Sequence, residues 1–231
     1  MVLNLLKWNF SNYFEFQSKS NMDTTGQSNL DAIRDIRKIM ERSSRFISLS
    51  GWSGIGAGVC AIIGAIAANR RITDYYADYD QKTACPGCLL QDLVFIAAAV
   101  FISAFIAAFL FTFLKSRKDG VAIWGTAARR LLWNTMLPMV AGGALLWKML
   151  DLGYYEMIVP STLVFYGLAL LNGSKYTMGE VRYLGYAEII TGIISLFIIS
   201  RGLYVWAFGF GVLHIVYGIS MWWKYDRKTD Q

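Results

Sequence analysis

Ionisable and reactive side chains are scarce in this chain of 231 residues, which has one histidine, three cysteines and only 16% charged residues. One histidine and three scattered cysteines do not supply the ligands of a zinc site. The sequence also lacks a glycine-rich phosphate loop and a nucleophile elbow. We therefore expect no metal and no cofactor, and the sequence leans against an enzyme without excluding one.

Hydrophobic residues, in contrast, make up 55% of the chain, too many for an ordinary soluble domain. They occur in blocks of about 20 residues, the length that crosses a bilayer as a helix. These blocks predict an all-α integral membrane bundle of six transmembrane helices and leave no room for a second folded domain. The predicted spans are Phe46–Ala68, Leu93–Leu114, Leu131–Leu150, Tyr155–Leu171, Leu184–Ser200 and Leu203–Trp223.

The net charge of +6 follows the predicted topology. With six spans, 17 of the 22 Lys and Arg residues lie on the side of the two termini. Because cytoplasmic loops carry the excess of Lys and Arg, this asymmetry predicts a multi-pass inner-membrane protein with both termini in the cytoplasm. The expected partner is the lipid bilayer, and no nucleic acid is expected.

The domain organisation follows from the same pattern. Residues 1–27 are predicted to be polar and disordered, 28–45 to form an amphipathic helix on the cytoplasmic surface, 46–223 to cross the membrane and 224–231 to form a cytoplasmic tail. Ser28 and Asp31 match a capping box at the start of the surface helix. Its basic side suits anionic headgroups. Binding of a cytoplasmic protein partner is the alternative.

Small residues recur at four-residue spacing in the first two spans, as in Ser53, Ala57 and Ala61, and again in Ala99 and Ser103. Such rows let membrane helices approach closely. Packing within one chain explains them, and a homo-oligomer formed through these faces is the alternative.

Cys85 and Cys88 form a CPGC motif in the first predicted outer loop. The CxxC spacing permits a disulfide, which persists in the periplasm. The motif is similar to that of the disulfide-generating quinone reductases of the bacterial inner membrane, which relay electrons through a second cysteine pair. Here the only other cysteine, Cys60, falls within the first span. A structural disulfide or an incidental pair is therefore favoured over a redox centre.

Glu188 and His214 are ionisable residues inside predicted spans, which makes them functional candidates. The short Ser200–Gly202 turn predicts that these two spans are antiparallel neighbours. Asn134 and Asn172 fall near the same predicted inner end. Together the four residues predict a polar pocket open to the cytoplasm, in which Glu188 exchanges protons or cations with His214 as its partner. The alternative is a glutamate that reaches interfacial water and a histidine with one interhelical hydrogen bond.

Three stretches resemble a family of multi-span membrane proteins from Bacteroidota: Met40–Gly51 (MERSSRFISLSG), Val164–Thr177 and Gly209–Gly218 (GFGVLHIVYG). The resemblance extends over most of the chain from Ile33 onward, and the CPGC loop departs from it. It implies an inner-membrane location and brings no activity, cofactor or catalytic residue.

Two functional classes remain open from the sequence. One is a small transporter or channel-like protein that uses the predicted pocket. The other is a non-catalytic sensor or assembly partner that binds a cytoplasmic protein through residues 28–45.

Overall fold

The computed structural model describes residues 50–80, 85–120 and 123–227. The polar segment predicted at 1–27 and the amphipathic helix predicted at 28–45 lie outside these residues. So do residues 46–49 of the predicted first span and the end of the predicted tail.

Every regular element among the described residues is helical, as predicted. The long helices are α2 (Gly51–Asp80), α3 (Pro86–Lys118), α4 (Thr126–Asp151), α5 (Ile158–Gly173) and α6 (Glu180–Ser195). The last rod, Gly202–Asp226, combines α7 (Gly202–Trp206), the π-helical turn η4 (Ala207–Leu213), α8 (His214–Met221) and the π-helical turn η5 (Trp222–Asp226). Short 3-10 turns η1 (Tyr155–Met157), η2 (Ser174–Tyr176) and η3 (Ile199–Arg201) lie between helices.

Local sequence explains the ends of α3. Cys85 caps the helix, since its Sγ accepts a hydrogen bond from the Cys88 backbone N–H, and Pro86 occupies the first turn, where no backbone donor is needed. Lys115, Arg117 and Lys118 lie in the last turn, where positive charge suits the helix dipole. The apolar run between them contains no helix breaker.

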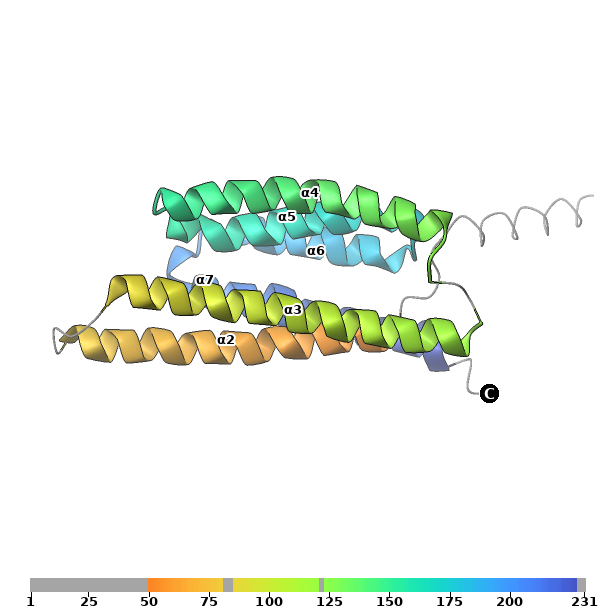
Figure 1. Ribbon diagram of the computed structural model, residues 1–231, viewed down its shortest axis with the longest axis horizontal. Coiled ribbons are helices and arrows are strands. Elements are labelled where there is room, and N and C mark those ends of the chain that lie inside the picture. Colours follow the sequence, from red (N-terminus) through yellow and green to blue (C-terminus); the bar gives the residue numbers. More distant parts are fainter. Residues whose placement is uncertain (1–49, 81–84, 121–122, 228–231) are drawn as a thin grey trace, which may run out of the picture. The chain divides into compact units, whose positions relative to one another are not determined.

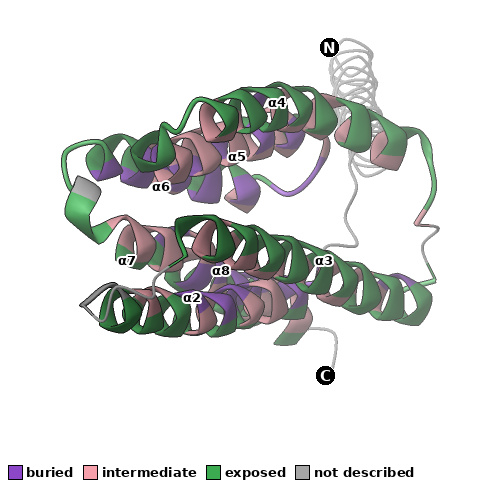
Figure 2. Cartoon of the chain, turned by 60° about the vertical axis from the view of Figure 1, so that its left-hand side comes forward, coloured by how far each residue is buried: buried purple, intermediate pink, exposed green. Residues whose placement is uncertain are grey.

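The long helices form two layers (Figure 1). In one layer α2 lies between α3 and the last rod, and in the other α5 lies between α4 and α6. The layers meet where α6 contacts η4 and α8. Figure 2 shows buried residues on α2, α5, α6 and α8, whereas α3 and α4 are mostly exposed.

Glycines bring α2 and the last rod into backbone contact. A Cβ on Gly51 would lie 2.5 Å from the Gly218 carbonyl oxygen, and one on Gly58 would lie 2.7 Å from that of Gly211. Both pairs are spaced by seven residues, or about two helical turns, so one antiparallel register satisfies both. Only glycine permits this approach.

The same spacing recurs between α5 and α6. A Cβ on Gly185 would lie 2.9 Å from the carbonyl oxygen of Gly167, and one on Gly192 would lie 3.1 Å from that of Pro160. Both layers are therefore built around a close antiparallel pair of helices held in fixed register.

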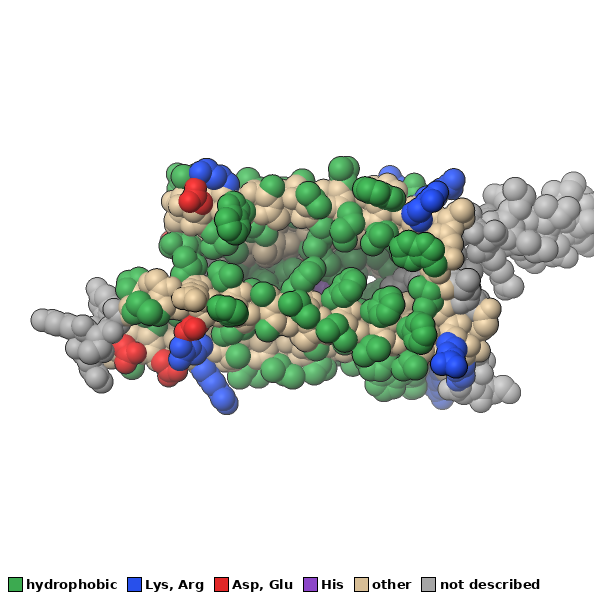
Figure 3. Space-filling model, in the orientation of Figure 1, with side chains coloured by type: hydrophobic (Ala, Val, Ile, Leu, Met, Phe, Trp, Pro, Cys, Tyr) green, Lys and Arg blue, Asp and Glu red, His purple; other side chains and the backbone are tan. Residues whose placement is uncertain are grey.

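The outer surface of the bundle is apolar. On α3, Phe95 is 68% exposed and Phe105 is 62% exposed. Figure 3 shows hydrophobic side chains along the rods and charged side chains near their ends. A soluble protein rarely exposes such a continuous apolar surface, whereas a membrane protein presents it to lipid.

Four helical segments among the described residues are long and apolar enough to cross a membrane: Gly51–Asp78, Pro86–Lys118, Tyr155–Tyr176 and Gly202–Asp226. Six were predicted. Of the other two, α6 has only 16 residues and contains Glu180, Arg182 and Glu188. The second of these two helices, α4, has 26 residues but carries Arg129, Arg130 and Lys148.

Candidate functional site

Glu188 lies at the centre of the buried face of α6. Glu188 is completely buried, and the same face of the helix also carries Gly185, Thr191, Gly192 and Ser195. Neither of its carboxylate oxygens has a hydrogen-bond partner in the described part of the chain. Burial of a carboxyl group without hydrogen-bond partners costs free energy. The few groups close to Glu188 therefore determine whether its carboxyl is protonated or charged.

His214 faces Glu188 from the other layer. Its Nδ1 lies 3.3 Å from Glu188 Oε1 and 3.2 Å from the carbonyl oxygen of Gly209. The histidine residue is 5% exposed. The structure therefore brings together the two ionisable residues that the sequence singled out.

Tyr166 of α5 completes the cluster. Its hydroxyl oxygen lies 2.7 Å from Nε2 of His214, and its ring stacks at a tilt on the rings of Phe210 and His214. Tyr166 was not among the residues predicted from the sequence. A usable signal existed, since a tyrosine in the middle of a span is unlike the interfacial tyrosines that are usual in membrane helices.

The π-helical turn η4 positions His214. Such turns are rare and are frequent at functional sites. Gly209 in this turn allows close approach to α6, since a Cβ there would lie 2.8 Å from Glu188 Oε2 and 2.5 Å from Leu163 Cδ2. A larger residue at this position would push the last rod away from Glu188.

Two proton arrangements fit this geometry. With both groups neutral, the Glu188 hydroxyl donates to Nδ1 and the Nε2–H donates to Tyr166. With Glu188 ionised and His214 protonated, Nδ1–H faces Glu188 and Gly209 while Nε2–H still donates to Tyr166. Because a tyrosine hydroxyl both donates and accepts, Tyr166 can also serve a histidine whose Nε2 is an acceptor. One proton can thus move between Glu188 and His214 while the Tyr166 contact is kept, whereas the hydrogen bond to the Gly209 carbonyl oxygen exists only when Nδ1 carries a proton.

Asn134 and Asn172 lie together elsewhere. Asn172 Nδ2 donates to the backbone carbonyl of Asn134 at 2.8 Å, and Asn134 Nδ2 donates to the carbonyl of Arg130 at 2.8 Å. The first of these bonds joins α5 to α4, and the second lies within α4. Among the described residues, hydrogen bonds and close contacts thus lie within a Glu188–His214–Tyr166 triad and within an asparagine pair, and none joins the two groups.

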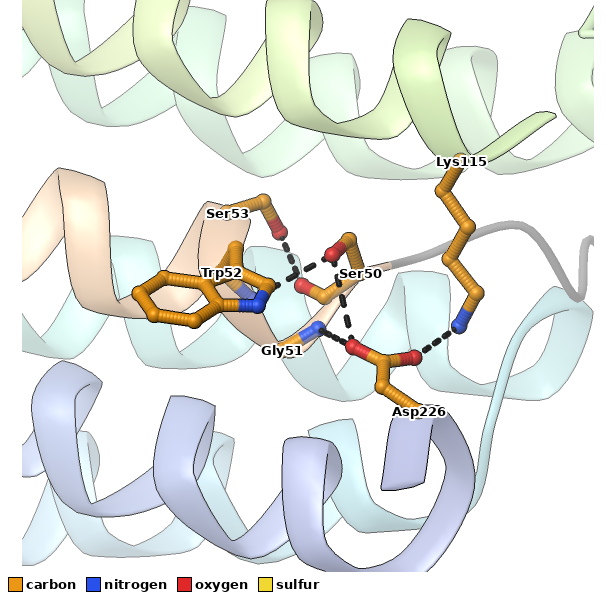
Figure 4. A network of polar contacts seen from close by, with 6 residues as sticks. All are labelled: Ser50, Gly51, Trp52, Ser53, Lys115 and Asp226. Carbon is orange, nitrogen blue, oxygen red and sulfur yellow. Dashed lines mark hydrogen bonds and ion pairs between the residues drawn. The ribbon is translucent and has the colours of Figure 1, made fainter. Parts of the chain in front are cut away.

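The end of the last rod ties both layers together. Asp226 accepts hydrogen bonds from the Gly51 backbone N–H at 3.0 Å and from the Ser50 hydroxyl at 3.4 Å, and it pairs with Lys115 at 2.5 Å (Figure 4). Lys224 and Tyr225 both donate to Oε1 of Glu180 on α6. Three consecutive residues thus connect α2 and α3 of one layer to α6 of the other.

A disulfide joins Cys85, which immediately precedes α3, to Cys88 in the first turn of this helix. Cys60 is a free thiol in α2. No cysteine other than these three exists in the sequence, so a second pair for electron relay is missing. Within the described ranges, no group of three or more His, Cys, Asp or Glu residues could hold a metal ion.

No family model, no curated protein and no solved structure matches the chain. The resemblance to membrane proteins of Bacteroidota therefore stays a prediction.

Proposed function

We propose that this multi-pass membrane protein is a small transporter or channel-like protein in which the Glu188–His214–Tyr166 triad binds and releases a proton. The observation that carries this proposal is the complete burial of Glu188, with neither oxygen hydrogen-bonded and His214 Nδ1 at 3.3 Å. A purely structural glutamate in an apolar bundle would be expected to have its hydrogen bonds satisfied. Intramembrane ionisable groups in this state mark ion or proton pathways.

The position of the triad supports a role in coupling. Glu188 belongs to α6 and His214 to the last rod, so the pair spans the contact between the two layers. Proton transfer between them converts a neutral pair into an ion pair across that contact. Binding or release of a proton by the pair changes its net charge. Both events alter the free energy with which the layers pack, which is what proton-coupled movement requires.

The proposal includes six membrane crossings, with both termini on the cytoplasmic side of the inner membrane. α4 and α6 lie alongside α5, which belongs to one of the four segments that are long and apolar enough to cross a membrane. Antiparallel packing of α5 with α6 places both ends of α6 level with the ends of a spanning helix. Glu188, which would be costly in lipid, faces the interior of the bundle instead.

Infrared titration of the purified protein in detergent tests the proposal without knowledge of a substrate. We expect a carboxylic-acid C=O band that changes with pH in the wild type and is lost in Glu188→Gln. His214→Gln should shift the pH at which that band titrates, because the two groups form a coupled pair. Glu180→Gln, at the end of α6, is the matched control and should retain the band.

Reconstituted vesicles with an internal pH dye give a second test, in which protons are the probe and a potassium gradient sets the potential. Glu188→Gln should abolish wild-type proton flux while membrane insertion stays intact. A Glu188 band that does not respond to pH, together with equal flux in the wild type and the variant, would overturn the proposal. That result would leave the sensor or assembly-partner class predicted from residues 28–45.

A further inference from the structure

Two hollows flank α7 on the membrane-facing surface. The larger, of about 340 Å³, is bounded by Ile194 and Ile198 on one side and by Tyr204, Val205 and Phe208 on the other. Thr191 lies at one end of this hollow and Arg201 at the other. The volume is within the range of sites that hold small organic ligands.

The lining has the chemistry of an amphiphile site. The hollow extends along the last turn of α6 from Thr191 to Ile194 and continues past the end of this helix to Ile198. Its walls are aliphatic and aromatic over this length. The positive charge is confined to Arg201, in the turn η3 where the helices end.

The Arg201 guanidinium has no ion pair or hydrogen bond within the described ranges, and the residue is exposed. An arginine at a helix end that is flanked by apolar surface normally carries its charge to the headgroup level of the bilayer. At that level the planar donors of the guanidinium match two oxygens of a lipid phosphate. In a zwitterionic lipid that phosphate lies beside a positive group of the same headgroup, whereas in an anionic lipid it does not.

The second hollow repeats this design on the other side of α7. It measures about 300 Å³, is lined by Ile62, Ile66 and Leu203, and has Arg70 at its rim. Arg70 also lacks an ion pair in the described structure, whereas its neighbour Arg71 pairs with Asp92. Two unpaired arginines thus lie at the rims of two apolar hollows that share Tyr204 as a wall.

From this arrangement we infer that the hollow below Arg201 binds an anionic phospholipid of the surrounding bilayer, with the phosphate on Arg201 and one acyl chain between α6 and α7. The direction of the hollow fits a bilayer lipid, because a chain that descends from the helix end toward the middle of the bundle is parallel to the helices. The inference does not depend on the proposed proton transfer, since Glu188 and His214 do not line the hollow.

Native mass spectrometry of the full chain in a neutral detergent tests the site, with phosphatidylglycerol and phosphatidylcholine of identical chains as probes. We expect the wild type to retain phosphatidylglycerol in preference to phosphatidylcholine. Arg201→Gln should weaken phosphatidylglycerol retention about fivefold, the effect of one arginine near anionic headgroups. Arg71→Gln removes an exposed but already paired arginine at the same end and should change retention little.

Ile194→Trp keeps Arg201 but fills the hollow, so it should lower phosphatidylglycerol retention as well. Equal losses in Arg201→Gln and Arg71→Gln would mean general surface attraction and would overturn the site. Full retention in Ile194→Trp would show that no chain occupies the hollow. Equal retention of phosphatidylcholine, or a copurified free fatty acid in place of phospholipid, would also overturn the inference.

Discussion

The carboxylate of Asp226 accepts a hydrogen bond from the backbone N–H of Gly51 at 3.0 Å, across 175 residues of sequence. Asp226 thus supplies an acceptor and a negative charge to the first turn of α2, where backbone donors are free. The same carboxylate pairs with Lys115 on α3, and both side chains are about 15% exposed.

Asp226→Ala should therefore destabilise the protein by about 1–2 kcal/mol, the usual loss of a capping acceptor and a charged hydrogen bond. Unfolding in mixed micelles, followed by circular dichroism, measures this change. Asp151→Ala is the control, since Asp151 and Lys148 form an exposed pair on one helix. Its effect should stay within about 0.5 kcal/mol. Equal effects of the two variants would contradict a stabilising role for Asp226.

Gly218→Ala should destabilise the bundle by about 1–3 kcal/mol, because the added Cβ would lie 2.6 Å from both the Gly51 carbonyl oxygen and the Ile55 nitrogen. These are backbone atoms and cannot rotate away. Gly143→Ala is the control, since a Cβ there meets nothing within 4 Å. It should be neutral or stabilise α4 by about 0.5–1 kcal/mol. The same unfolding assay compares them, and a loss at Gly143 equal to that at Gly218 would refute the close-packing argument.

Stability in acid should depend on Glu180. Burial alone would raise the pKa of this carboxyl, but hydrogen bonds from Lys224 and Tyr225 outweigh that effect and hold the pKa below its ordinary value. A carboxyl with a depressed pKa stabilises the folded state above its unfolded pKa of about 4.3, and the contribution is lost as the pH falls through the folded pKa.

Melting temperatures measured from pH 7 down to about 3 should therefore fall less steeply for Glu180→Gln than for the wild type. Exposed Glu156 offers a control, since Glu156→Gln should leave the wild-type slope unchanged. Parallel curves for the wild type and Glu180→Gln would exclude a contribution from this ion pair.

Membrane orientation can be tested with single cysteines in a chain whose own cysteines are replaced by serine. Ala77→Cys lies near the end of α2, and Asp119→Cys follows α3. With cytoplasmic termini, a membrane-impermeant maleimide should label residue 77 and not residue 119 in spheroplasts. The reverse pattern would invert the topology, and labelling of both would contradict a crossing by α3.

The helical class was predictable because apolar block length is a property of contiguous sequence. The number of spans was harder to predict, since α4 and α6 carry charged residues and are not among the four segments that are long and apolar enough to cross a membrane. The antiparallel placement of Glu188 beside His214 followed from the short turn between their helices. The contact of Tyr166 with His214 could not be predicted in this way, because the contact between α5 and α8 depends on how helices that are distant in the sequence pack.

The contacts of the two asparagines were also not predictable from the sequence. Asn134 and Asn172 were grouped with Glu188 because all lie toward one predicted end of the bundle. Position along the membrane axis says nothing about which face of a helix a side chain occupies. The structure places the asparagines on the contact between α4 and α5, where each amide donates to a backbone carbonyl.

The glycine contacts in fixed register also determine which parts of the bundle can move. The backbones of α2 and the last rod touch, as do those of α5 and α6, so neither pair can slide without a clash of main-chain atoms. Relative motion of these two pairs then takes place at the contact between the layers, which Lys224 and Tyr225 hold to Glu180 at one end. Glu188 and His214 lie on the same contact. The transfer of a single proton between them would therefore act where one pair of helices moves against the other.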